Sequence, residues 1–279
     1  SLRIHREKRM HTIHELRYSN TNTYLIRGEK GSLLLDTGWA GTFPAFCRAM
    51  GEIKVPVQDI DYILISHFHP DHMGIAQEIA DLGPKIAAAD LQREFIHAAD
   101  GVFLKERRVS FSPIREEEVL FFKTEESRDF LMRLGIRGEI LPSPGHSRDS
   151  ISLSLDTGEL FVGDLNPLYE LEAHKGDEIW ATWQKLLARK PRTVYYGHAP
   201  KAVLAEGTSA PKNSPKKEKE LFALVQRIMK EIDRGRSLEA IAQKTHAEPS
   251  FIEDVARMYL THKNVGVQGI LDRIEIKGM

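Results

Sequence analysis

A short apolar run that ends in a cluster of histidines is the feature that most constrains this chain. Residues 62–72 read YILISHFHPDH, and the first five of them predict a short buried β-strand. Side chains two residues apart on a strand share a face, so His67 and His69 can point at one centre. The chain then turns, which directs Asp71 and His72 at a neighbouring centre. Imidazole and carboxylate groups suit zinc and related divalent metals, and three histidines with an open position indicate a hydrolytic site.

Three further candidate metal ligands stand at predicted strand ends. They are His146 in the sequence PGH, Asp164 in GD and His198 in GH. Loops at one edge of a rigid sheet framework are where binding and catalytic side chains usually lie. These three residues are therefore candidates for the same site as the first histidine cluster.

The remainder of the first 200 residues alternates short apolar runs with turn signals and helical patterns. Helices are predicted over residues 74–82 and 125–134 and around Trp180 and Trp183. The predicted strands cover residues 23–27, 32–36, 62–66, 86–89, 150–155, 160–162 and 193–196. The pattern by itself predicts a strand-rich α/β fold, and it leaves most of residues 98–138 unassigned.

A change of composition predicts a second region. Residues 205–215 read AEGTSAPKNSP, which is typical of a linker. Helical patterns beyond it cover residues 216–233, 237–245 and 249–260. We therefore predict a catalytic domain over residues 1–207 and a small helical domain over residues 208–279.

The charge balance and the cysteine count exclude several classes of protein. The 279 residues include 39 Lys plus Arg and 40 Asp plus Glu, so no global excess of positive charge favours a polyanionic partner. The single cysteine, Cys47, excludes an internal disulfide framework and an all-thiolate metal site. No apolar run reaches the roughly 20 residues that cross a bilayer, and the charged start is unlike a signal peptide. We expect a cytoplasmic protein without a membrane partner.

Together with the turn at residues 36–38 (DTG), these motifs resemble, in identity and order, those of the metallo-β-lactamase-fold hydrolase superfamily. The resemblance extends over roughly residues 10–205. It implies an α/β (α+β) protein, a four-layered αβ/βα sandwich with the site at one edge of two packed sheets. It also implies a dinuclear metal centre, in which the first metal is held by His67, His69 and His146, the second by Asp71, His72 and His198, and Asp164 bridges both.

The resemblance further implies hydrolysis without a covalent protein nucleophile. Two divalent ions lower the pKa of a shared water, which provides a bridging hydroxide near neutral pH. Asp71 is the expected catalytic residue, which orients this nucleophile and moves its proton. A His/Asp ligand set accepts zinc, iron or manganese, and we expect two zinc ions per chain. Tyr169, near Asp164 in sequence, and Arg148, near His146, are candidate substrate-binding residues.

The ligand set also narrows the substrate. Without a metal-binding cysteine, and with Asp71 and His72 present, the chain resembles the glyoxalase II-like thioesterase and lactonase branches, so we expect a small thioester or lactone. A phosphodiesterase or ribonuclease of the same fold is one alternative. The other is a regulatory protein whose C-terminal helices bind nucleic acid or a partner. Residues 208–279 include only 13 Lys plus Arg against 10 Asp plus Glu, so we do not expect a nucleic-acid partner. An apolar helix face offers a homodimer contact through Phe222, Leu224, Val225 and Ile228.

Overall fold

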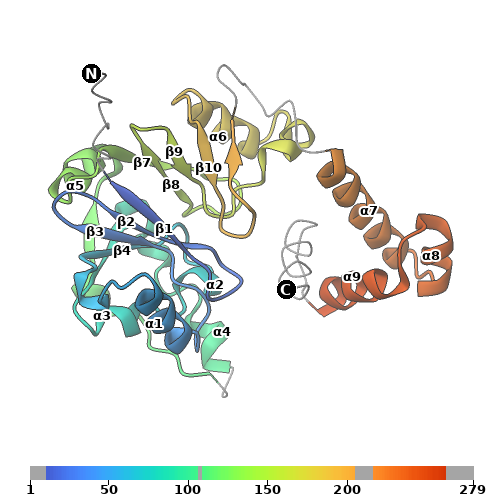
Figure 1. Cartoon of the computed structure of the whole chain (residues 1–279), viewed down its shortest axis with the longest axis horizontal. Helices are drawn as coiled ribbons and strands as arrows, with labels where there is room; N and C mark the ends of the chain where they lie inside the picture. The colour runs from blue at the N-terminus through green and yellow to red at the C-terminus, as the bar shows by residue number, and fades with distance from the viewer. Residues whose placement is uncertain (1–10, 106–108, 205–215, 262–279) are drawn as a thin grey trace, which may run out of the picture. The chain divides into compact units, whose positions relative to one another are not determined.

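The computed structural model describes residues 11–105, 109–204 and 216–261 (Figure 1). The chain divides into two compact units, Ser1–Ser209 and Ala210–Met279. The first unit contains two β-sheets and several helices, and the described part of the second is helical. The predicted domain boundary at residue 207 and the predicted linker lie outside the described residues.

Two sheets form the centre of the first unit. The first sheet has the strand order β1-β2-β3-β4-β5-β6, and β3 to β6 run parallel. Its strands are β1 Thr12–Leu16, β2 Thr23–Arg27, β3 Ser32–Leu35, β4 Tyr62–Leu64, β5 Lys85–Ala89 and β6 Leu120–Phe122. The second sheet has the order β11-β10-β9-β8-β7, and β9 and β10 run parallel. Its strands are β7 Gly138–Pro142, β8 Ile151–Leu155, β9 Glu159–Phe161, β10 Thr193–Tyr195 and β11 Ala202–Val203.

Helices cover the outer faces of both sheets, with α1 and α3 on the first and α6 on the second (Figure 1). The α-helices of this unit are α1 Phe43–Glu52, α2 Pro70–Met73, α3 Ala76–Ala80, α4 Asp100–Lys105, α5 Ser127–Arg133 and α6 Glu178–Leu187. Short 3-10 helices are η1 Val57–Asp59, η2 Asp90–Phe95, η3 Glu116–Glu118, η4 Thr124–Glu126 and η5 Leu168–His174. No helix of the described residues combines the length and apolar character that crossing a membrane requires.

The alternation of side chains along the strands explains why the unit has four layers. On β2, Tyr24 and Ile26 point into the apolar core between the two sheets, whereas Leu25 points into the core beneath α1. In the second sheet, Phe161 faces the core between the sheets and Leu160 faces the core beneath α6. Both faces of these strands are buried, as continuous apolar runs predict. The arrangement confirms the predicted four-layered α/β sandwich.

Parallel strands bring the candidate ligands to one edge of this sandwich. Asp36 and His67 follow the neighbouring parallel strands β3 and β4. Asp164 and His198 follow β9 and β10, which are also parallel neighbours. His146 lies in the connection between β7 and β8. Because carboxyl ends of parallel neighbours meet at the same sheet edge, residues far apart in sequence meet there.

Several elements differ from the sequence prediction. The predicted helix over residues 74–82 is shorter, since α3 covers Ala76–Ala80. Strands β1 and β7 and helix α1 were not predicted. The polar residues of β1 at the sheet edge hide its pairing with β2. Helix α1 did carry a recognisable signal, because Pro44 stands in its first turn and Phe46 and Met50 form its buried face.

The second unit is built from α7 Lys216–Asp233, α8 Leu238–Thr245 and α9 Pro249–Thr261. Ser237 caps α8 by accepting a hydrogen bond from the N–H of Ala240. Val225 and Ile228, two residues of the proposed dimer face, are fully buried in the core of this unit. They are therefore unavailable to a partner chain, and the side chain of Phe222 lies outside the described residues.

Candidate metal centre

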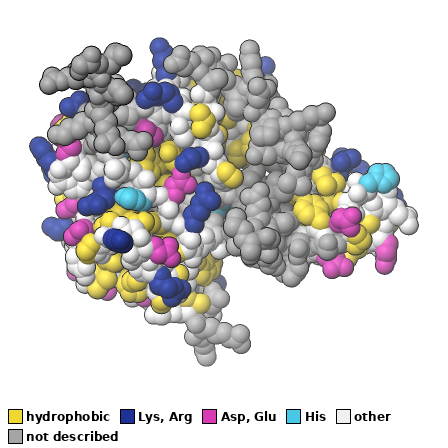
Figure 2. All heavy atoms as spheres, viewed as in Figure 1, with side chains coloured by type: hydrophobic (Ala, Val, Ile, Leu, Met, Phe, Trp, Pro, Cys, Tyr) yellow, Lys and Arg dark blue, Asp and Glu magenta, His cyan; other side chains and the backbone are white. Residues whose placement is uncertain are grey.

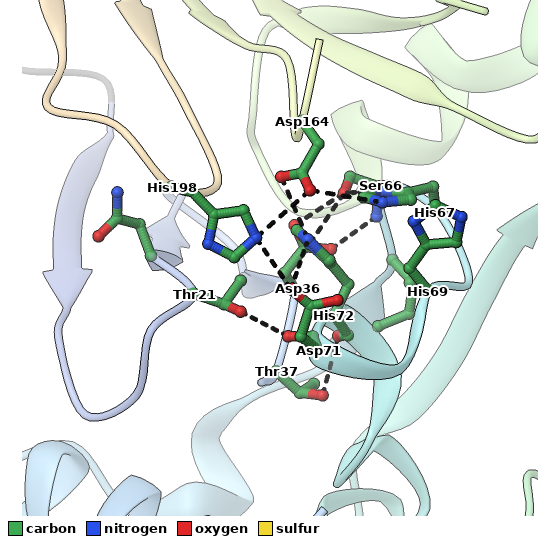
Figure 3. Close-up of polar contacts among 12 residues, drawn as sticks. Thr21, Asp36, Thr37, Ser66, His67, His69, Asp71, His72, Asp164 and His198 are labelled. Atoms are coloured by element: carbon green, nitrogen blue, oxygen red, sulfur yellow. Dashed lines mark hydrogen bonds and ion pairs between the residues drawn. The ribbon is translucent and has the colours of Figure 1, made fainter. Parts of the chain in front are cut away.

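The first histidine cluster lies in an irregular segment between β4 and α2 (Figure 3). Strand β4 ends at Leu64, so His67 and His69 do not stand on a strand, and the strand-period argument for their common direction is wrong. Hydrogen bonds from neighbouring loops hold the segment instead. Pro70 then starts α2 directly after His69, which places Asp71 in its first turn.

Glycine precedes three of the candidate ligands, and before Asp164 and His198 it allows the loops to pack closely around the site. A Cβ atom at Gly197 would collide with Asp164 Oδ1 and would lie 2.9 Å from His72 Cε1. Gly163 has a φ of +56°, and a Cβ atom there would lie 2.7 Å from Ser66 Oγ. The GD and GH sequences therefore reflect close packing around the site.

The structure brings His67, His69 and His146 together as a first group. Their donor atoms lie within 4.8 Å of one another, and His146 Nε2 is 3.0 Å from His69 Nδ1. His67 is buried, whereas the other two are exposed. Three converging imidazoles suit a metal ion that keeps a further position open for substrate or water.

A second group contains Asp71, His72, Asp164 and His198, whose donor atoms also lie within 4.8 Å of one another. His198 Nε2 is 2.9 Å from Asp71 Oδ2 and 3.3 Å from Asp164 Oδ2. The two groups adjoin, because the ring centroids of His67 and His72 are 4.1 Å apart.

Asp164 faces both groups (Figure 3). Its Oδ2 atom lies 3.8 Å from His67 Nε2 and 3.6 Å from His146 Nε2. Its Oδ1 atom lies 3.2 Å from His72 Nε2. All seven candidate ligands therefore meet in one cluster, and Asp164 lies where a ligand shared by two metal ions would lie.

Buried polar atoms inside the cluster show that it suits metal ions. His67 Nε2, His72 Nε2 and Asp164 Oδ1 are buried and have no hydrogen-bond partner among the described residues, despite the short distance between the last two. Such an unsatisfied buried atom costs about 1–3 kcal/mol. A divalent ion would satisfy these lone pairs, and a nitrogen and oxygen donor set without sulfur suits zinc, iron or manganese. The residues present fit two divalent ions.

Burial and neighbouring charges shift the pKa values of the histidines in opposite directions in the two groups. Burial, together with the nearby His72, holds the pKa of His67 well below its usual value, and burial also lowers the pKa of His146. Burial acts in the same direction on His72 and His198, but the negative charges, that of Asp164 foremost, hold their pKa values well above the usual one. His67 and His146 therefore stay neutral, whereas His72 and His198 hold protons beside the carboxylates of the second group.

Both carboxylates of the second group stay ionised. Burial raises the pKa of Asp71, but His72 and His198 outweigh it and bring this pKa to about 2. Burial likewise opposes the ionisation of Asp164, and the same two histidines hold its pKa well below its usual value.

Asp36 is connected to both ligand groups, directly to His72 and through Ser66 to His67. It is buried, and its Oδ2 atom accepts a hydrogen bond of 2.8 Å from Ser66 Oγ and lies 2.9 Å from His72 Nδ1. With one proton held on Nδ1 by Asp36, His72 would present its Nε2 lone pair to a metal ion that displaces the second proton. Ser66 Oγ lies 3.1 Å from His67 Nδ1. Sequence analysis singled out the turn at Asp36 through the resemblance and missed Ser66, since a serine before the histidines carries no distinctive signal.

The two candidate substrate-binding residues are not part of the ligand groups. Arg148 is exposed in the loop after His146, and no hydrogen bond or ion pair among the described residues joins it to a candidate ligand. Tyr169 is half-buried in η5. A substrate role for both remains a prediction. The neighbouring Asp149, which sequence analysis missed, is buried and bonds to the first histidine segment.

Comparisons with known sequences agree with this geometry. Residues 16–198 match the family described as the metallo-beta-lactamase superfamily. A beta-lactamase-like protein 2 homolog of Drosophila melanogaster is 29% identical over 181 residues, 64% of this chain and 58% of the fly protein. An atrochrysone carboxyl ACP thioesterase of Aspergillus aculeatus is 25% identical over 226 residues, 77% of this chain and 63% of that protein. The match thus spans less than two thirds of each relative.

A solved structure shows the same fold. The BLEG-1 B3 metallo-beta-lactamase superposes with a TM-score of 0.53 at 22% sequence identity, covering 70% of this chain and 94% of that one. At this identity, the likeness supports the architecture alone.

Proposed function

The chain belongs to the metallo-beta-lactamase superfamily, generally metal-dependent hydrolases, and we propose that it hydrolyses a small acyl substrate, a thioester or a lactone. The observation that carries the proposal is the convergence of seven histidine and aspartate side chains in two adjoining groups around Asp164. The thioesterase among the relatives supports an acyl substrate, and the absence of a sulfur ligand agrees with the thioesterase and lactonase resemblance.

Each group would hold one divalent metal ion. The ligands proposed for the first are His67, His69, His146 and Asp164, and those proposed for the second are Asp71, His72, His198 and Asp164. Bound there, the ions would polarise the acyl oxygen and lower the pKa of an attacking water. We propose zinc, because it tolerates low coordination numbers with imidazole and carboxylate ligands, while iron or manganese also suit this donor set.

Asp71 is the proposed catalytic residue. The first turn of α2 fixes its backbone, whose carbonyl accepts a 2.6 Å hydrogen bond from Thr21 Oγ1. Its carboxylate contacts His198, and we propose that it orients the attacking water. As the water oxygen adds to the acyl carbon, the carboxylate accepts a proton. The C–S or C–O bond then breaks, and the proton passes to the departing thiolate or alkoxide.

The charge distribution favours this reaction over cleavage of a polyanion. The formal net charge is −1, and basic and acidic side chains are interspersed on the face shown in Figure 2. In the second unit, Lys244 and Arg234 form ion pairs with Glu231, and Glu253 is exposed on α9. An acidic side chain on that helix opposes the phosphate contacts that nucleic-acid binding by the C-terminal helices needs. Phosphodiester cleavage and nucleic-acid binding are therefore the less supported alternatives.

The proposal is tested by metal analysis of the purified chain and by assays with a thioester, a lactone, a β-lactam and a phosphodiester. We expect two metal ions per chain and turnover of the thioester or the lactone. His69→Ala should abolish turnover in a folded protein, whereas His97→Ala, at an exposed histidine bonded to Asp100, should not. Exclusive turnover of the phosphodiester, or full activity of His69→Ala, would contradict the proposal.

A further inference from the structure

A buried carboxylate links the two loops that carry the first histidine group. Asp149 lies three residues after His146 and is 3% exposed. Its Oδ2 atom accepts a 2.7 Å hydrogen bond from the main-chain N–H of Phe68. Phe68 is the residue between His67 and His69. One side chain thus connects the loop that carries His146 to the segment that carries the other two histidines.

Gln92, on a third element, η2, forms hydrogen bonds to the backbone of both loops. It is fully buried, and its Nε2 atom donates hydrogen bonds to the carbonyl oxygens of Ile65 (2.9 Å) and Asp149 (3.1 Å). Its Oε1 atom accepts a hydrogen bond from the N–H of Ala89 at the end of β5. Both donors and the acceptor of the amide are used, so the backbone around Asp149 is fixed from both sides.

The environment of Asp149 separates it from an ordinary structural ion pair. No lysine, arginine or histidine among the described residues forms an ion pair with it. A buried carboxylate is costly unless hydrogen bonds or opposite charges compensate it. Here the described compensation is the N–H of the residue between two candidate ligands, which connects the burial of this carboxylate to the metal centre.

We propose that Asp149 is a positioning residue of the first metal site. Through the Phe68 N–H it holds His67 and His69 at the separation from His146 that a single ion requires. Zinc–imidazole distances of about 2.0–2.1 Å leave little tolerance, so a displacement of one loop separates the ligands from the ion. The inference rests on the metal centre of the proposed function and is independent of the substrate.

The test measures zinc affinity at each site separately, by titration of the full chain against a competing chelator. A His198→Ala background isolates the first site, and a His146→Ala background isolates the second. In the first background, Asp149→Ala should weaken zinc binding about 10–100-fold, the usual effect of losing a residue that orients metal ligands. In the second background, the same substitution should leave the affinity unchanged.

Conservative variants distinguish positioning from charge. Asp149→Asn keeps an oxygen acceptor for Phe68 and should restore most of the first-site affinity. Asp149→Glu keeps the charge but displaces the acceptor, so its first-site zinc affinity should be as low as that of Asp149→Ala. If the alanine variant fails to fold, the glutamate variant provides the test. Asp61→Ala is the control for the hydrogen bond, because the exposed Asp61 likewise accepts a main-chain hydrogen bond, of 2.8 Å, from the Ser32 N–H at the opposite end of β3.

Equal losses at both sites, no loss at the first site in a folded Asp149→Ala protein, or an equal loss in Asp61→Ala would overturn the inference. A wild-type chain that binds zinc but hydrolyses neither thioester nor lactone would overturn the proposed function and leave this inference standing.

Discussion

The two ligand groups share Asp164 but differ in charge and burial. The first consists of three imidazoles, two of them exposed, and the second combines two carboxylates with two imidazoles, of which His72 is fully buried. A dication entering the first group meets the neutral imidazoles of His67 and His146 and one shared carboxylate, whereas one entering the second displaces protons from His72 and His198 and meets two carboxylates. We therefore expect the second group to bind metal more tightly near neutral pH, and the first to depend more on how its loops are held.

Removing the shared ligand should produce the largest effect. Asp164→Ala takes a carboxylate from both groups, and we expect kcat/KM to fall by about 10⁴-fold, the scale seen when one member of a cooperating catalytic unit is lost. Metal analysis should show that both ions are lost or weakened. A variant that retains two ions and half of its activity would show that the two groups are independent.

Metal removal should destabilise the first unit alone. Ions present at about 1,000 times their dissociation constant stabilise the native state by about 4 kcal/mol, and a chelator removes this contribution. All three tryptophans, Trp39, Trp180 and Trp183, lie in the first unit, so tryptophan fluorescence during denaturant unfolding reports on it selectively. An unchanged unfolding midpoint after verified metal removal would contradict the expectation.

Crowding the shared Asp164 and His72 of the second group should lower the rate of hydrolysis. A Cβ atom at Gly197 would collide with Asp164 Oδ1 and approach the His72 ring. Since a displacement of about 1 Å can cost about 100-fold in rate, we expect a loss of that order for Gly197→Ala. The control is Gly51→Ala in α1, where an added Cβ meets nothing within 4 Å and should stabilise the helix by about 0.5–1 kcal/mol. Equal activity of the two variants would refute the packing argument.

The support behind the two groups should give the smallest effects. Asp36→Asn replaces the acceptor that orients His72, and we expect second-site metal affinity to fall about 10–100-fold. Ser66→Ala removes the hydroxyl beside His67 Nδ1 and should weaken the first site by about tenfold, near the lower end of that range. Metal titrations of both variants at each site test these two expectations. An effect of Asp36→Asn on the first site alone would contradict the proposed contact with His72.

Sequence patterns identified the candidate ligands, but not the reason why they converge. The HxHxDH spacing and the GD and GH dipeptides are short motifs that can be recognised in the sequence alone. The structure places all seven side chains in one cluster. The expected strand geometry for His67 and His69 was wrong, because β4 ends at Leu64. Their segment is held by hydrogen bonds that the N–H groups of Ser66 and Phe68 donate to Asp36 and Asp149, which lie about 30 and 80 residues away in the chain.

The donor atoms of the site and the burial of its strands on both faces could be predicted from the sequence alone. Histidine and aspartate in this spacing restrict the donor atoms, and apolar runs such as residues 23–27 require burial on both strand faces. The tertiary structure decided which residues hold the ligands in place. Gln92 and Asp149 acquire their roles only when the two sheets meet, and Ser66 acquires its role when β3 brings Asp36 beside the end of β4. A buried hydrogen bond between distant segments depends on positions in space, and local sequence patterns do not encode it.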